Sequence, residues 1–120
     1  MKAKRILIAD DDEGILDAVK TMCEVLGYEV NIVANGNQVI EAVKQQQPDL
    51  LLLDIWMSGI DGREVCQQLK ANEATQKLPI LMISASRQIK ESALACGAND
   101  FLAKPFEMTT MMKKIETLTA

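Results

Sequence analysis

The chain has 120 residues, of which 48% are hydrophobic and 25% charged, and its 17 acidic and 13 basic side chains give a net charge of −4. This length suits one domain with a single core, residues 1–120, and the composition is that of an ordinary globular protein. The acidic balance argues against direct binding of nucleic acid, which requires Lys and Arg to neutralise many phosphates. Only a short apolar run, Ile6 to Ala9, precedes the first aspartates, so we expect no signal peptide and no membrane span, and a cytoplasmic location.

The three cysteines, Cys23, Cys66 and Cys96, are far apart in the sequence, and each falls in a segment with a helical pattern. The chain contains no His and no close pair of cysteines, which excludes a zinc site. We therefore expect buried free thiols in a reducing compartment.

The first predicted strand, Arg5–Ala9, is a short apolar run that ends in three aspartates, Asp10, Asp11 and Asp12. Asp12 can cap the helix that follows, but capping explains only one of the three acids. Apolar residues recur through that helix at helical spacing until Gly27 ends it. These apolar positions are Ile15, Val19, Met22 and Leu26.

Residues 29–34 form the second predicted strand, and they alternate apolar and polar side chains as an edge strand does. Asn35-Gly36 then turns the chain into a second helix. The apolar positions of this helix are Val39, Ile40 and Val43.

The third predicted strand consists of four consecutive leucines, Leu50 to Leu53, followed by Asp54. A run that is apolar on both faces is typical of a central strand in a parallel sheet. Pro48 precedes the strand, and the Gly-Ile-Asp-Gly segment of residues 59–62 indicates a loop after it. Asp54 therefore lies at the carboxyl end of a central strand, where open α/β sheets carry their sites.

The remaining chain repeats the same alternation. A helix is predicted from about Gly62 to Asn72, with Asp61 as its N-cap and with Val65 and Leu69 facing inward. The later elements are a strand over residues 79–84, a helix over 88–96 that Gly97 ends, a strand over 100–103, and a C-terminal helix whose apolar positions are Met108, Met111, Met112, Ile115 and Leu118.

Five strands thus alternate with five helices, and each interval leaves room for one crossover helix. The sequence therefore predicts an α/β fold, with a parallel sheet that is covered by helices on both faces.

In such a sheet the carboxyl ends of the strands lie along one edge, and five polar residues stand there: Asp10, Asp11, Asp54, Ser84 and Lys104. Neighbouring carboxylates repel one another unless a cation lies among them. Without His or thiolate ligands, the cation that suits this oxygen cluster is Mg²⁺, bound by carboxylates, a backbone carbonyl and water.

Mg²⁺ with open coordination positions also suits phosphoryl transfer, because it neutralises the charge of the phosphoryl oxygens. Asp54 is then the candidate nucleophile, with Lys104 and Ser84 contacting the phosphoryl oxygens. Each residue also has an ordinary interpretation, as a turn residue, a strand-end cap or a solvated lysine. Their coincidence at the ends of four strands favours the site.

The motifs around these residues resemble those of response-regulator receiver domains of bacterial two-component systems. The matching segments are Asp10-Asp11-Asp12, the stretch around Asp54 up to Gly62, Ile83-Ser84-Ala85, and the stretch from Gly97 through Lys104-Pro105 to Phe106.

The resemblance implies a flavodoxin-like fold, with five parallel strands in the order 2-1-3-4-5. It also implies that Asp54 accepts a phosphoryl group from the His of a sensor histidine kinase or of a histidine phosphotransfer protein. Asp10, Asp11, Asp54 and the backbone carbonyl of Trp56 would surround Mg²⁺. Such a domain is not an enzyme beyond its own phosphorylation and dephosphorylation.

The resemblance further implies that Ser84 and Phe101 form a switch pair and that the Lys104-Pro105 peptide is cis. Phosphorylation would change partner binding at the face formed by the fourth helix, fifth strand and fifth helix, which includes Met108, Met111 and Met112. Ser84 stands where Thr is more usual and Ser58 where Pro is common.

Trp56 is bulky where many relatives have a small or polar residue. Its ring either screens the acyl phosphate from water or belongs to a partner surface.

Three alternatives stay open at this point. A pseudo-receiver would be an interaction module that is never phosphorylated, although such modules usually lack the acids or the lysine. A flavin binder of the same fold would need more aromatic residues than the four present, and the aspartates would repel its phosphate. A hydrolase of phosphorylated small molecules would need a general acid and a substrate pocket. The downstream partner, a phosphorylation-dependent homodimer, and membership of a larger regulator or hybrid kinase are also open.

Overall fold

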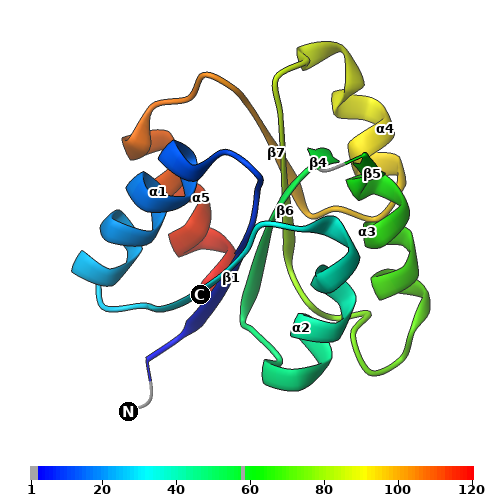
Figure 1. Cartoon of the computed structure of the whole chain (residues 1–120), viewed down its shortest axis with the longest axis horizontal. Coiled ribbons are helices and arrows are strands. Elements are labelled where there is room, and N and C mark those ends of the chain that lie inside the picture. The colour runs from blue at the N-terminus through cyan, green and yellow to red at the C-terminus, as the bar shows by residue number, and fades with distance from the viewer. Residues whose placement is uncertain (1–2, 58) are drawn as a thin grey trace.

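The computed structural model describes residues 3–57 and 59–120. Five parallel strands form one sheet in the order β2-β1-β3-β6-β7, which is the predicted order 2-1-3-4-5 (Figure 1). Their bounds are β1 (Arg5–Ala9), β2 (Glu29–Val33), β3 (Leu50–Asp54), β6 (Ile80–Ser84) and β7 (Asp100–Ala103). The flavodoxin-like α/β prediction is confirmed.

Five α-helices cover the two faces of the sheet, with α1 and α5 on one face and α2, α3 and α4 on the other (Figure 1). Parallel strands must be joined by crossover connections, and these usually contain a helix. Their bounds are α1 (Glu13–Val25), α2 (Val39–Gln46), α3 (Gly62–Ala71), α4 (Lys90–Ala95) and α5 (Met108–Thr119), with 3₁₀ turns at Gly36–Gln38 and Arg87–Ile89.

Strand β3 is the centre of the core, and its four leucines are fully buried. Leu50 and Leu52 belong to the cluster under α1 and α5, and Leu51 and Leu53 belong to the cluster on the other face. Because side chains alternate along a strand, a strand covered on both faces needs apolar residues at every position. The leucine run therefore fixes β3 in the middle of the molecule.

Helix α1 follows the prediction at both ends but not along its inner face. The Asp12 side chain accepts a hydrogen bond from the Ile15 amide as N-cap, and Gly27 takes a positive φ after the helix. The buried positions are Leu16, Val19 and Cys23. Leu26 was predicted to face inward but is 41% exposed, because it is the C-cap residue beyond the last full turn.

The segment after Asp54 was predicted as a loop, but it contains a short antiparallel hairpin of β4 (Trp56–Met57) and β5 (Ile60–Asp61). Strands of two residues are too short to show a period in the sequence. Met57 is buried in the core, which fastens the hairpin to the domain. Ser58, which stands where Pro is common in relatives, lies outside the described residues.

The last two helices also differ from their predictions. The helix predicted over 88–96 is a 3₁₀ turn followed by the six residues of α4, with Cys96 as C-cap. In α5, Met111 and Ile115 are buried, whereas Met108, at its first residue, is 37% exposed. Met111 is thus a core residue and does not belong to an output surface. Within the described residues, no helix is both long and apolar enough to cross a membrane.

The cysteines are buried free thiols, as predicted. Burial raises the pKa of Cys23 to about 11 and, with the neighbouring Cys96, that of Cys66 to about 12. Cys23 and Cys66 are therefore unreactive core thiols at neutral pH.

Candidate functional site

Two neighbouring strands bring the predicted acids together. Asp10 directly follows β1, and Asp54 is the last residue of β3, which pairs with β1 in parallel. Both carboxylates are buried, with 0% and 5% of the residue exposed, whereas Asp11 is exposed. One carboxylate oxygen from each of Asp10, Asp11 and Asp54 lies within 4.8 Å of the others. This is the geometry of a site that three carboxylates could share around one cation.

Lys104 reaches the same cluster from the end of β7. Its Nζ atom lies 3.0 Å from Asp10 Oδ2 and 3.4 Å from Asp54 Oδ2. The Lys104 backbone amide donates to the Ser84 carbonyl at 2.7 Å, which anchors the residue to the end of β6. The Lys104-Pro105 peptide is cis, as the resemblance implies. The ammonium is therefore held between the two buried acids.

The charges of this cluster do not balance. Burial, together with the charge of Asp10, raises the pKa of Asp54 to about 6, although Lys104 acts in the opposite direction. Burial would lower the pKa of Lys104, but its ion pairs with Asp10 and Asp54 raise it. The cluster of three carboxylates thus contains one ammonium, paired with Asp10 and Asp54, and an added cation would relieve the excess negative charge.

The donor atoms fit a hard divalent cation. Asp10 Oδ1 accepts from the Asp12 amide at 2.9 Å. Asp10 Oδ2 is fully buried and receives no hydrogen bond of good geometry from the described residues, although it faces the Lys104 ammonium. A buried carboxylate oxygen with an incomplete shell is a suitable ligand, and an all-oxygen set matches Mg²⁺ better than a softer metal.

Ser84 ends β6, which is the strand next to β3. Its hydroxyl is buried and accepts a hydrogen bond from the Ser86 amide at 3.0 Å. Phe101 lies on β7, and its ring is already buried in the cluster on the α2–α4 face of the sheet. The structure therefore places Ser84 on the same edge as the acids and Phe101 in the core behind it.

The sequence did not indicate the roles of two residues next to the site. The first is Gly62, whose amide donates to the Ile55 carbonyl and closes the base of the hairpin. A Cβ atom at Gly62 would lie 2.6 Å from the carbonyl oxygen of Asp54, so only glycine allows this close approach. The sequence predicted Asp61 as the N-cap and Gly62 as the start of the helix, and both are confirmed, but it did not indicate the contact of Gly62 with the Asp54 backbone.

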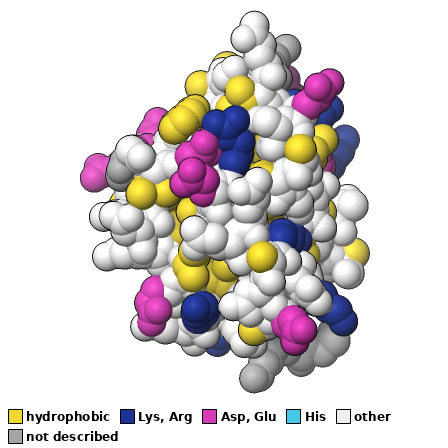
Figure 2. Space-filling view, turned by 90° about the vertical axis from the view of Figure 1, so that its right-hand side faces the viewer, with side chains coloured by type: hydrophobic (Ala, Val, Ile, Leu, Met, Phe, Trp, Pro, Cys, Tyr) yellow, Lys and Arg dark blue, Asp and Glu magenta, His cyan; other side chains and the backbone are white. Residues whose placement is uncertain are grey.

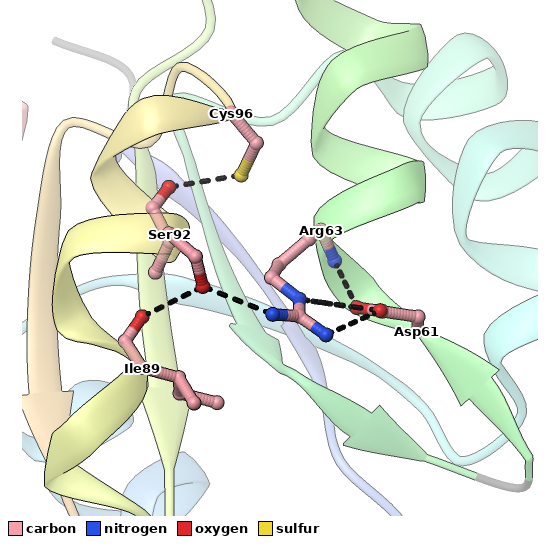
Figure 3. Close-up of polar contacts among 6 residues, drawn as sticks. Asp61, Arg63, Ile89, Ser92 and Cys96 are labelled. Carbon is pink, nitrogen blue, oxygen red and sulfur yellow. Dashed lines mark hydrogen bonds and ion pairs between the residues drawn. The ribbon is translucent and has the colours of Figure 1, made fainter.

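The second is Arg63, the second residue of α3. Its guanidinium donates to the Asp61 carboxylate at 2.7 to 3.2 Å and to Ser92 Oγ at 2.9 Å (Figure 3). The same group lies 5.5 Å from the centre of the Trp56 ring. No sequence pattern marks such a residue, because its partners come from three separate segments.

Trp56 is 57% exposed, so its ring is a surface feature beside Arg63. Figure 2 shows the side of the molecule that carries α3 and α4, on which charged side chains of both signs are mixed with hydrophobic ones. An exposed tryptophan of this kind suits contact with another protein.

Comparison with known proteins agrees with this arrangement. Residues 6–116 match the model of the response regulator receiver domain. The sheet order, and the acid cluster with a lysine at the carboxyl edge of the sheet, agree with this family match. The chain therefore belongs to the response-regulator receiver domain family.

The chain is also similar in sequence to individual response regulators. It is 39% identical over 116 residues to the DNA-binding dual master transcriptional regulator RpaA of Synechocystis. The aligned region covers 95% of this chain and 48% of that protein. The chain spans about half the length of the curated relatives it matches. These matches give no support to a flavin-binding protein or a hydrolase.

Solved structures show the same fold over nearly the whole chain. A putative response regulator from Chloroflexus aurantiacus has a TM-score of 0.93 at 32% identity, with 98% of both chains covered. The receiver domain of the sensor histidine kinase PA1611 from Pseudomonas aeruginosa has a TM-score of 0.88 at 28% identity, again with 98% of both chains covered. That structure contains a magnesium ion coordinated in its active-site cleft.

Proposed function

We propose that this receiver domain, residues 1–120, is a phosphoacceptor in which Asp54 takes a phosphoryl group from a phosphohistidine. The observation that carries the proposal is the buried cluster of Asp10, Asp54 and Lys104, built from the ends of three strands. The donor would be a sensor histidine kinase or a histidine phosphotransfer protein. The reaction belongs in the cytoplasm, where such donors carry their phosphohistidine.

Asp10, Asp11, Asp54 and the backbone carbonyl of Trp56 would hold Mg²⁺, directly or through water. Bound there, the ion supplies the positive charge that three crowded carboxylates and an incoming phosphoryl group need. The related receiver with magnesium in its cleft supports this choice of cation.

In the transfer step, a carboxylate oxygen of Asp54 attacks phosphorus and the P–N bond of the phosphohistidine breaks. The bonding electrons leave with the imidazole, which takes a proton from solvent. Lys104, now 3.4 Å from Asp54, would then pair with a phosphoryl oxygen, and its ion pair with Asp10 holds it in place. No general base is needed, because the nucleophile is the ionised carboxylate.

Phosphorylation would be detected first at Ser84. Its hydroxyl oxygen accepts from the Ser86 amide, and its proton would be donated to a phosphoryl oxygen, a charged acceptor that forms a strong hydrogen bond and would draw the hydroxyl toward Asp54. The face formed by α4, β7 and α5 would then change its affinity for a downstream protein or effector domain. The resemblance also implies that the Phe101 ring turns inward as Ser84 moves, and this stays a prediction, since the ring is already buried in this structure.

The phosphohistidine donor would approach along the groove between α1 and the segment after β7. This groove adjoins Lys104 and is lined by apolar side chains, among them Ile15, Ala18, Pro105 and Phe106. A donor that covers these side chains would place its imidazole beside the acid cluster and exclude water from it.

The test is the intact mass of the protein after incubation with acetyl phosphate, with Mg²⁺ or with EDTA. We expect one added phosphoryl group in the presence of Mg²⁺ and none in EDTA or in Asp54→Asn. Asp17→Asn, which changes an exposed aspartate on α1, is the matched control and should be phosphorylated normally.

Failure of both acetyl phosphate and a histidine-phosphorylated donor to modify the wild type would contradict the proposal. The chain would then be a pseudo-receiver that acts by contact alone.

A further inference from the structure

Arg63 connects two parts of the molecule that are separated in sequence. Its guanidinium lies between the β4–β5 hairpin and α4 (Figure 3). On the hairpin side it donates to both carboxylate oxygens of Asp61 and faces the ring of Trp56. On the α4 side it donates to Ser92 Oγ. A planar group with several donors can hold these partners at once, which a lysine ammonium on its flexible stem cannot do.

The hairpin side is directly tied to the candidate site. Trp56 follows Asp54 by two residues, and the Gly62 amide bonds the carbonyl of Ile55, the residue between them. The backbone of Trp56 is also a proposed ligand of Mg²⁺. A change of occupancy at Asp54 therefore acts on the strand that carries the Trp56 ring.

Helix α4 is held weakly by its own interactions. It has six residues, its N-cap residue Ile89 makes no side-chain capping bond, and Ala93 is its one buried residue. Ser92 donates its hydroxyl proton to the Ile89 carbonyl while it accepts from Arg63 (Figure 3). The Arg63 bond thus stabilises the first turn of a short helix that is close to the low-stability end of the structure.

We propose that Arg63 is a positioning residue that couples the loop after Asp54 to α4, with Ser92 as its partner on the helix. The inference rests on the proposed phosphoacceptor function. When phosphorylation of Asp54 moves the hairpin, the hydrogen bond from Arg63 to Ser92 weakens or strengthens, and the stability of α4 changes with it.

Two measurements report separately on the hairpin and on α4. Trp56 is the sole tryptophan, so intrinsic fluorescence reports the hairpin side. Hydrogen exchange of residues 90–95, read by mass spectrometry, reports α4. Each is measured with Mg²⁺, with and without excess acetyl phosphate, and each variant is compared with its own unphosphorylated state.

Ser92→Ala removes the hydrogen bond between Arg63 and α4 and leaves the contacts of Arg63 with Asp61 and Trp56. We expect it to keep the phosphoryl adduct and the fluorescence response but to reduce the exchange response of α4 by about fivefold or more. Arg63→Lys should change both responses. Thr117→Ala is the matched control, because it also removes an exposed hydroxyl bonded to its own helix, and it should keep both.

The outcomes separate the two proposals. If the adduct forms and Ser92→Ala retains the full exchange response of α4, the coupling role of Arg63 is overturned. The same holds if phosphorylated wild type shows no response in α4. If the wild type forms no adduct with any donor, the phosphoacceptor function fails and the inference fails with it.

Discussion

The strands that carry the acids and the elements beside them are held very differently. Every residue of β3 is buried, and β1 pairs with strands on both sides. The hairpin–α4 side, by which we mean β4, β5 and α4, consists of short elements joined by Arg63, with the Trp56 ring exposed. The acids are thus positioned by packing along whole strands, whereas the adjacent elements bury few side chains, such as Met57 and Ala93, and are also held by polar contacts. This division suits a domain that performs one fixed chemistry and transmits a variable signal.

The largest effect should come from the strand framework itself. Leu52→Ala removes a fully buried side chain from the central strand and leaves a cavity, which should lower the free energy of unfolding by about 2–5 kcal/mol. Denaturant unfolding measures it. Val25→Ala, at a residue 81% exposed, is the control and should stay within about 0.5 kcal/mol. Equal effects at the two positions would contradict the comparison.

A smaller effect is expected where the two regions meet. Gly62→Ala would place a methyl group 2.6 Å from the Asp54 carbonyl oxygen, and the backbone must shift to accept it. We expect a loss of about 1–3 kcal/mol in unfolding free energy, with weaker Mg²⁺ binding because Asp54 is displaced. Unfolding and a Mg²⁺ titration of Trp56 fluorescence measure the two effects.

Gly14→Ala is the matched control for that substitution. Gly14 lies in the first turn of α1, and a Cβ atom there would lie 3.3 Å from a side-chain oxygen of Asp12, which can shift more easily than a backbone carbonyl. Alanine is the better helix former, so stability should be unchanged or slightly increased. Normal Mg²⁺ binding by Gly62→Ala would show that the contact does not position Asp54.

The polar contacts of the hairpin should depend on pH. The hydrogen bonds from Arg63 lower the pKa of Asp61, so its ionised form stabilises the folded state. This contribution is present above the unfolded pKa of about 4 and is lost as the pH falls through the lower folded value. Asp61→Ala, which also removes the N-cap of α3, should cost about 1 kcal/mol at pH 7 and less at pH 3.

Asp61→Asn separates the two contributions, since an amide oxygen can still cap α3. Its stability relative to the wild type should change with pH by the same amount as that of Asp61→Ala, because neither variant titrates at this position, but its loss at pH 7 should be smaller because the cap is kept. A difference between Asp61→Ala and the wild type that is the same at pH 3 and pH 7 would exclude a role for the Arg63 ion pair.

The smallest effect concerns Trp56. Its exposed ring beside Arg63 favours a partner surface over a screen for the acyl phosphate. Trp56→Ala should therefore change the dephosphorylation rate by less than about twofold, or about 0.4 kcal/mol in the barrier. Decay of the phosphoryl adduct measured by intact mass checks this, and a much faster decay would favour the screening role.

Much of the fold could be predicted because local patterns and global topology agree. The leucine run of β3, the caps at Asp12 and Asp61, and the glycines that end the helices each allow one structure. The order of the strands came from the resemblance and is confirmed. The inner face of α1 was shifted in the prediction, because Ile15 and Leu16 are both apolar and the sequence alone does not say which one faces the sheet.

The sequence by itself determined the strand ends, and with them the residues Asp10, Asp54, Ser84 and Lys104 that meet at one edge, because parallel strands align their carboxyl ends. Only the tertiary structure decided the distances among them, the near approach of Gly62 to the Asp54 backbone, and the contacts of Arg63 with Asp61, Ser92 and Trp56. The physical reason is that strand and helix patterns are encoded by neighbours along the chain. Contacts between separate segments depend instead on how helices and hairpins pack, and no local pattern records them.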